Sequence, residues 1–539
     1  MALFAELRRR NILKVALLYA VTSWLAVWFV DTIRARVDLP GWTDIFLYTL
    51  LAIGFPVALW FAWTYEFTPA GLKKAVDVDQ TQSIVYKTGQ KLNAAVAVFL
   101  VLGVLAVFGQ RLLPTFEFLV PAAPQGDVPL ASTTPGAIRS MTLDNGLEII
   151  VWPQDAGPNI VMYGFVRAGS RNEHAGNTGI AHFLGHLDTA ASGGVLDHEL
   201  SWTGDYTAYR LVFPRSALEA VFNSEAERID GLISDPAVIS AQRAIVLAER
   251  QSDFDNNHFQ LLSEQVRAAA FAVHPYRQPQ HGWPSDINAW SAADVAAFHE
   301  DYFGPNNRTL VLVGNLVPAD AFELADEILG PIEAREVPAM RAREPEQLGV
   351  RRVALHSSGA ETQLQLAFHT GPVTSPEALP LSLLLQVLAG DDSSRLHRLL
   401  VEEQSLALSV SASLDRGIDP GLIVFSVVLA PDASPADVEA QLLLELQRIA
   451  VEGVGEDELE VARAAVLDDF EQQLQDIVGK ARMLGVVAVL HGNYEAAFRL
   501  PVNAAAVTSD DLAAAAAQTF NIDNMTVGVA HAIVEAGPE

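Results

Sequence analysis

Two histidines with helical spacing are the residues of this chain best suited to chemistry. His182 and His186 lie in the segment Gly-Ile-Ala-His-Phe-Leu-Gly-His, residues 179–186. Residues four apart lie one above the other on a helix, so two such imidazoles can bind one metal ion. The spacing alone is weak evidence, because the chain has 13 histidines and a helix with two polar residues has the same pattern.

Glu249 is the candidate third ligand. It lies 63 positions after His186, in a helical pattern whose Ile245 and Leu247 we expect to pack inward. A ligand from a second helix, with water in the fourth position, completes the layout of a catalytic zinc site.

The position next to His186 lacks the residue that such a site uses as its base. In the H-x-x-E-H pattern, the glutamate before the second histidine acts as general base. Here that position is Gly185, and loss of a placed base lowers the rate by about 10²–10⁴. Asp188, Glu199 and Asp205 are the acids that we weigh as substitutes.

The first 113 residues predict a membrane anchor. Three apolar runs, at residues 12–30, 45–65 and 92–109, are each about 20 residues long, as a bilayer-spanning helix requires. Basic residues precede the first run and lie between the second and third, so the N-terminus is expected in the cytoplasm. Three crossings then place the rest of the chain on the other side, which in a bacterium is the periplasm of an inner-membrane protein.

Charge separates the anchor from the rest. Residues 1–115 have a net charge of +4 and the remainder −34. An outer part this acidic argues against nucleic acid as a partner and mildly favours basic peptides, although a solvated acidic surface that aids solubility is the better explanation. The chain has no cysteine, so it has neither disulfides nor a cysteine nucleophile.

The outer part predicts an α+β fold in two halves. Residues 114–137 are rich in Pro, Ala, Gly and Ser and predict a linker. Strand-like and helical runs alternate over 138–335, a connector follows at 336–348, and a similar order of elements returns over 349–539. We interpret the two halves as an internal duplication.

Three ordered segments resemble the insulinase or pitrilysin family of zinc metallopeptidases: "AGSRNE…GIAHFLGH", "HPYRQP…GWPSDINAWSAADVAAFHEDYFGPNNRTLVLVGN" and "GDDSSRLHRLLVEEQSLALSVSA". The resemblance spans roughly residues 140–530. It implies two tandem homologous α+β domains, with His182, His186 and Glu249 as ligands of one Zn²⁺. It also implies that two such pairs of domains close as a clamshell around unfolded peptides.

This chain also departs from the family. In addition to the change at Gly185, the interval between His186 and Glu249 is shorter than usual. The arginine and tyrosine that hold the substrate carbonyl in some members align with Val401 and Leu408. The N-terminal segment resembles a proteobacterial membrane module found before varied regulatory domains.

These observations leave two main hypotheses. The first is a membrane-anchored peptide-binding or partner subunit that is impaired in proteolysis and pairs with itself or with an active paralogue. The alternative is an active zinc endopeptidase or oligopeptidase with a substitute base. A scaffold or sensor whose anchor matters most has little positive support.

Overall fold

The computed structural model describes residues 65–68, 71–74, 137–155, 157–191, 199–231, 235–255, 257–357 and 361–532. The chain divides into two compact units, residues 1–128 and 129–539. The described part of the first unit is an antiparallel hairpin of β1 (Tyr65–Thr68) and β2 (Gly71–Lys74). Apart from Tyr65, the predicted membrane spans lie outside the described residues. No helix within the described residues has both the length and the apolar character needed to cross a bilayer.

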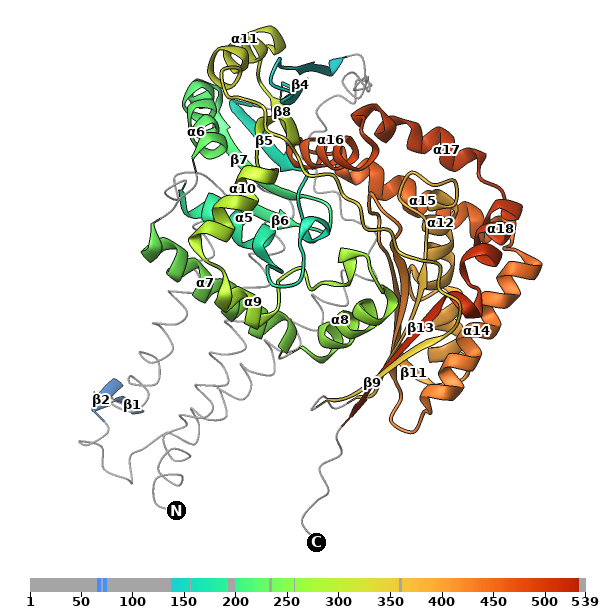
Figure 1. The fold of residues 1–539 in the computed structure, drawn as a ribbon. Coiled ribbons are helices and arrows are strands. Elements are labelled where there is room, and N and C mark those ends of the chain that lie inside the picture. Colours follow the sequence, from blue (N-terminus) through green and yellow to red (C-terminus); the bar gives the residue numbers. More distant parts are fainter. Residues whose placement is uncertain are drawn as a thin grey trace. The chain divides into compact units, whose positions relative to one another are not determined.

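The first half of the second unit contains a six-stranded sheet (Figure 1). Its strands, in spatial order, are β3 (Arg139–Thr142), β4 (Glu148–Pro153), β8 (Arg308–Gly314), β5 (Asn159–Val166), β7 (Thr207–Pro214) and β6 (Glu199–Trp202). All neighbours are antiparallel except β4 and β8. A turn at Asn145 and Gly146 joins β3 to β4, and Gly146 has the positive φ of 84° that such turns favour.

The second half repeats this arrangement. Its five-stranded sheet has the order β11 (Ala407–Leu414), β12 (Leu422–Leu429), β10 (Gln363–His369), β13 (Met525–Ala532) and β9 (Arg351–Ser357). In the first sheet β4 is parallel to β8, and in the second sheet β9 is parallel to β13. From these pairs the strands continue in the same order, β4-β8-β5-β7-β6 in the first sheet and β9-β13-β10-β12-β11 in the second. This shared topology supports the interpretation as a duplication, and the predicted α+β class is confirmed.

The sheet of each half packs against one helix from the other half. The first sheet is covered on one face by α6 (Leu218–Asp230) and α11 (Pro318–Leu329), and on the other by α16 (Ile477–His491) from the second half. The second sheet packs against α12 (Ala378–Ala389), α14 (Pro435–Glu452), α15 (Glu456–Gln473) and α18 (Ser509–Thr519) on one face. Its other face packs against α8 (His258–Ala270) from the first half. The two halves therefore share their hydrophobic cores.

Two glycines permit these crossed contacts. A Cβ at Gly485 of α16 would lie 1.9 Å from the Phe165 ring, and one at Gly528 of β13 would lie 2.2 Å from Val266 of α8. Both distances are far below van der Waals contact, so any larger residue would push the exchanged helix off the sheet.

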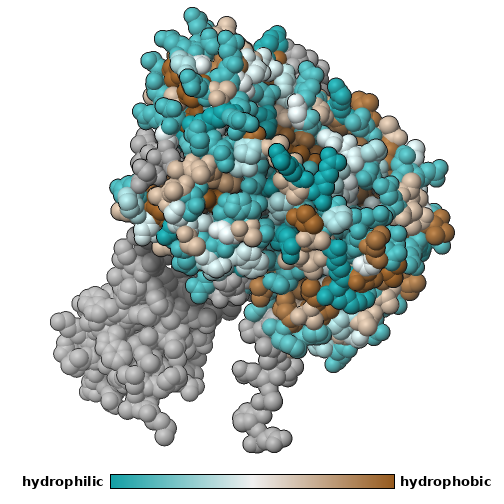
Figure 2. All heavy atoms as spheres, in the orientation of Figure 1, coloured by the Kyte–Doolittle hydropathy of each residue, from teal (hydrophilic) through white to brown (hydrophobic). Residues whose placement is uncertain are grey.

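A separate helical layer surrounds the predicted site (Figure 1). It consists of α5 (Ile180–Ala191), α7 (Pro236–Arg250), α9 (Pro284–Ala289) and α10 (Ala292–Tyr302). The helix that we predicted around Glu249 is present as α7, followed by a π-helical turn at Gln251–Asp255. Our expectation for Ile245 was wrong: it is 43% exposed, whereas Val246 is buried. On the face in Figure 2, hydrophobic residues form separate patches among hydrophilic ones.

Candidate metal centre

The start of α5 is fixed by a buried carboxylate. Glu173 is 3% exposed and accepts hydrogen bonds from the backbone N–H groups of Gly179 and Ala181, at 2.7 and 2.9 Å. Burial raises the pKa of this carboxyl to about 8. Because these donors are the first N–H groups of the helix, Glu173 sets where α5 begins and hence which residues its inner face presents.

The three predicted ligands converge at one point. Glu249 Oε2 lies 3.4 Å from His182 Nε2 and 3.1 Å from His186 Nε2, and the two imidazole nitrogens are 2.8 Å apart. In tetrahedral zinc sites with metal–ligand bonds of about 2.0–2.1 Å, ligand atoms lie about 3.3 Å apart. The residues present therefore fit a single small cation, and they form the one such group found in the described part of the chain.

Burial and hydrogen bonding favour the protonation states that bind metal. His182 is 1% exposed, and burial lowers its pKa, which favours the neutral ring. The hydrogen bond with His182 lowers the pKa of Glu249, which favours the carboxylate. Neutral imidazole and ionised carboxylate are the metal-binding forms. The hydrogen bond that usually orients a metal-binding imidazole is missing, because among the described residues no acceptor lies within reach of the buried His182 Nδ1.

An apolar side chain fills the space next to Gly185. A Cβ built at this position would lie 2.7 and 2.9 Å from the two methyl carbons of Leu200, which belongs to β6. The side of the helix where H-x-x-E-H sites have their base therefore faces leucine. Within the described residues, the contacts at this position provide no oxygen that could take a proton from a metal-bound water.

Three further residues surround the cluster, and sequence reasoning missed them. The Trp202 indole stacks on His182 with ring centroids 3.8 Å apart and an angle of 18°. The His281 ring is 5.0 Å from that of His182, and its Nε2 lies 3.9 Å from Asp253 Oδ2. Burial lowers the pKa of His281 to about 4. No spacing rule connects residues 202, 253 and 281 to the histidine pair, so only the fold could reveal them.

Two of the acids weighed as substitutes for the base, Glu199 and Asp205, are paired elsewhere. Glu199 Oε2 lies 2.6 Å from Arg210 in an ion pair, and the Tyr276 hydroxyl donates to Asp205 Oδ1 at 2.6 Å. Asp188 follows His186 on α5, but its side chain lies outside the described residues.

A loop of the second half is tied to the segments around the site. Asp419 Oδ2 accepts hydrogen bonds from Arg171 at 2.5 Å and from His274 at 3.1 Å. Burial alone would raise the pKa of Asp419, but these two partners hold it at about 2. Since His274 begins the segment that reaches His281, the site and the second half form one connected structure.

The second-half positions that resemblance assigns to substrate contacts are apolar. Val401 lies in the π-helical turn Arg398–Glu403 and packs against the core, and Leu408 is 53% exposed on β11. Neither side chain can donate a hydrogen bond to a carbonyl group.

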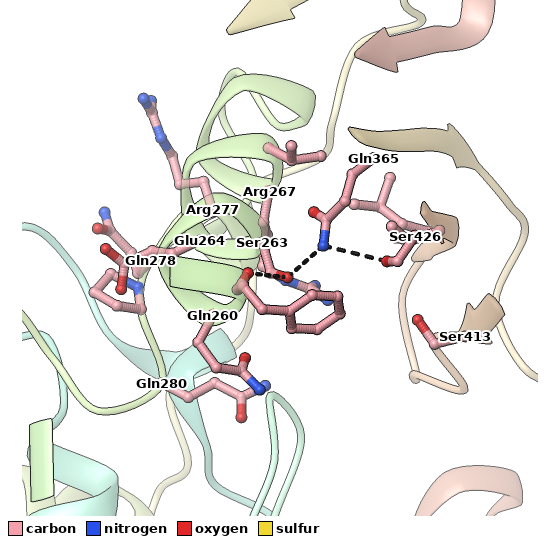
Figure 3. Close-up of a pocket in the computed structure, with 15 residues that line it drawn as sticks. Gln260, Ser263, Glu264, Arg267, Arg277, Gln278, Gln280, Gln365, Ser413 and Ser426 are labelled. Atoms are coloured by element: carbon pink, nitrogen blue, oxygen red, sulfur yellow. Dashed lines mark hydrogen bonds between the residues drawn. The ribbon is translucent and has the colours of Figure 1, made fainter. Parts of the chain in front are cut away.

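A polar pocket of about 330 Å³ lies between α8 and strands β10 to β12 (Figure 3). In it, Gln365 donates to Ser263 at 2.7 Å and to Ser426 at 3.2 Å. Glu264 on its wall binds Arg250, the residue after the ligand Glu249, at 3.0 Å. The pocket thus borders the support of the cluster but contains none of its three ligands.

Comparison with known proteins gives a consistent family likeness. A family model described as "Peptidase M16 inactive domain" matches residues 289–466. The chain is 24% identical to the zinc protease PqqE of Helicobacter pylori over 364 residues, covering 63% of this chain and 82% of that protein. The chain is similar to M16 peptidases.

Two solved structures share the fold. A protease from Helicobacter pylori superposes with a TM-score of 0.69 at 22% identity, covering 73% of this chain and 99% of that one. A peptidase M16 inactive domain from Pseudomonas fluorescens gives 0.65 at 17% identity, covering 74% and 99%. The family match begins at residue 289, after all three ligand candidates, so its description does not bear on the metal cluster.

Proposed function

We propose that this chain is an M16-type peptidase homologue that binds one Zn²⁺ through His182, His186 and Glu249 and binds peptides without cutting them efficiently. The observation that carries this proposal is the pairing of Gly185 with Leu200 beside an otherwise convergent ligand set. The chain has retained the groups that hold a metal and lacks the group that would use it.

The division of roles follows from chemistry. Bound zinc would polarise a peptide carbonyl and acidify a coordinated water. His182 and His186 would hold the ion through Nε2, and Glu249 through Oε2. The base position, occupied by glycine and covered by leucine, cannot accept the proton. We therefore expect binding of peptide with turnover reduced by about 10²–10⁴.

The edge of the first sheet supports peptide as the ligand. β6 is the last strand in its sheet, and its outer edge pairs with no other strand among the described residues. An open edge binds an extended peptide through main-chain hydrogen bonds. Because β6 carries both Leu200 and Trp202, a peptide added there would pass beside the metal ligands.

The remaining parts of the proposal concern location and assembly. We propose that residues 1–113 anchor the chain in the bacterial inner membrane, with the peptidase-like halves in the periplasm. We also propose that a second copy, or an active paralogue, completes a closed chamber. The apolar N-terminal runs and the two-part organisation of residues 138–539 support these proposals.

An active peptidase is the second candidate, and one observation favours it. Among the described residues, His281 and Asp253 lie beside the cluster and could replace the missing base. This candidate predicts chelator-sensitive cleavage that is abolished by His281→Asn or Asp253→Asn while zinc remains bound.

The deciding experiment measures zinc content and peptide cleavage on the same preparation. The full chain, purified without chelators, is incubated with a mixed peptide library beside Gly185→Glu and His186→Ala. We expect about one zinc per chain, binding of library peptides, and cleavage only after glutamate is introduced; His186→Ala should lose the metal. Chelator-sensitive cleavage by the unaltered chain at a rate equal to that of Gly185→Glu would overturn the proposal.

A further inference from the structure

A large cavity lies in the second half, away from the metal ligands. It has a volume of about 1070 Å³ and is bounded by α12, α15, α16, α17 (Leu500–Ala506) and the loop at residues 370–376. Helix α16 packs on the first sheet and not on the sheet of its own half, and this leaves the space that forms the cavity. Ligand pockets in proteins range over about 300–1,000 Å³, so this space is at the upper end.

Its walls are mainly apolar. Val486, Val487 and Leu490 of α16 line one side, and Val466 and Phe470 of α15 also line it. The three α16 side chains are partly exposed, although they belong to a helix that is largely buried. Such a surface gains free energy when apolar groups cover it.

Three arginines line the same cavity without carboxylate partners. Arg416, Arg482 and Arg499 are exposed, and no acidic group of the described residues lies within ion-pair distance of any of them. Unpaired guanidinium groups at an apolar cavity favour a ligand that carries a carboxylate.

The acidic residues of the cavity are already engaged. Asp469 accepts a hydrogen bond from Gln473 at 3.0 Å, and Asp511 accepts from the Thr508 backbone and hydroxyl at the start of α18. Asp415 is paired with Arg267 at 2.9 Å. With Asp415 paired to Arg267, the three arginines outnumber the two remaining carboxylates, so the net charge of the lining is positive.

Two hydroxyl groups in the lining also lack partners. Thr370 is 7% exposed, and its Oγ1 has no hydrogen-bond partner among the described residues; the same holds for Ser375 Oγ. A buried hydroxyl without a partner is unfavourable, so a polar group of a ligand that bonded to this loop would be stabilised.

One residue of the lining is connected through the chain to the metal site. Tyr206 lines it and lies at the end of the tight turn after β6, in which the Thr203 N–H donates to the Tyr206 carbonyl at 2.9 Å. Trp202, which stacks on His182, begins this turn. Arg482 is close enough to Tyr206 to lower its pKa against the larger, opposite effect of burial. A chain bound along β6 would reach the cavity within a few residues.

We infer that this cavity binds an apolar peptide segment that carries a carboxylate, which the unpaired arginines recognise. The inference rests on the proposed peptide-binding function and names the peptide class. It reverses, for this subsite, the preference for basic peptides suggested by overall charge. A C-terminal carboxylate and acidic side chains share this chemistry, and the experiment separates them.

The test measures binding of labelled apolar octapeptides to the full chain by fluorescence anisotropy. The probes end in two glutamates, in two lysines, or in apolar residues with a free or an amidated C-terminus. We expect the glutamate probe to bind at least tenfold more tightly than the lysine probe. If the free and amidated apolar probes also differ, the terminal carboxylate is recognised; if they bind equally, acidic side chains are.

Arginine variants locate the binding. Arg482→Gln combined with Arg499→Gln should weaken binding of the glutamate probe by about tenfold or more. Arg482→Glu combined with Arg499→Glu should shift the binding preference toward the lysine probe. Arg448→Gln is the matched control, because Arg448 is exposed on α14 and paired with Glu445 and Glu452. Equal binding of all probes, or unchanged binding by the double variant, overturns the inference. The proposed function fails separately, if no library peptide binds or no zinc is retained.

Discussion

Restoring glutamate at position 185 is the sharpest perturbation of this site. The new side chain would be the base that the ligand set lacks, but its Cβ would meet Leu200 at 2.7 Å. Carbon atoms in contact lie about 3.5–4.0 Å apart, so Leu200 must move away by about 1 Å. Since Leu200 is only partly buried and the clash involves its terminal methyl groups, we expect Gly185→Glu to fold.

The magnitudes favour a double variant. A placed general base contributes about 10²–10⁴ in rate, or about 3–5 kcal/mol of barrier. Replacing glycine within a helix regains up to about 1 kcal/mol of helix stability. Leu200→Ala costs less than the 2–5 kcal/mol or so typical of a fully buried leucine. Gly185→Glu with Leu200→Ala should therefore cleave faster than Gly185→Glu alone, because glutamate can then adopt the productive rotamer.

The assay follows a quenched fluorogenic peptide with zinc content measured on each sample. Gly185→Gln with Leu200→Ala is the matched control, since it has the same shape without a base and should remain inactive. The reasoning would be refuted if the double glutamate variant, with zinc bound, cleaved no faster than this glutamine control.

Three other perturbations test the surrounding structure. Glu249→Gln should weaken zinc binding by more than the 10–100-fold or so lost on removing an outer-shell group, as competition with a chelator would measure. Glu225→Ala should destabilise the fold by about 3–5 kcal/mol in urea unfolding, because it removes the carboxylate that lies 2.6 Å from the fully buried Arg308 guanidinium. The pKa of Asp419 is about 2 in the folded chain against 3.8 ordinarily, so its contribution to stability is complete above pH 4 and lost as pH falls toward 2. Asp419→Asn should consequently differ from the unaltered chain in stability at neutral pH and converge with it at low pH.

Periodicity and turn residues were sufficient for the local elements of the outer part. The strand-like residues 159–166 form β5, and Ser434 with Pro435 starts α14, the Ser434 hydroxyl accepting from the Ala436 N–H. These signals are local, since they depend on side-chain alternation and on caps within one turn of helix. Helix α16 was missed because it is apolar on most sides, and its partner is the sheet of the other half.

The ligands of the site were predictable, and their surroundings were not. His182 and His186 have a spacing that a helix converts directly into proximity, and motif resemblance pointed to Glu249. Leu200 and Trp202 reach the cluster only through the pairing of β6 with β7, which no short-range pattern specifies. The inward face of α7 was misjudged for a related reason: which of its side chains is buried depends on where α5 and α9 lie.

The geometry separates binding of a metal from its use. The ligands converge, and burial holds His182 in its metal-binding form, so affinity depends on residues that the chain has kept. The buried Nδ1 of His182 has no acceptor among the described residues, and metal-bound histidines that lack this outer contact bind about 10–100-fold more weakly. In the proposed function, Gly185 and Leu200 leave this position without a proton acceptor, which we expect to lower the rate without changing any of the three candidate ligands. A site altered in these ways can still hold zinc and orient a peptide carbonyl, but the chemical step then proceeds without a general base.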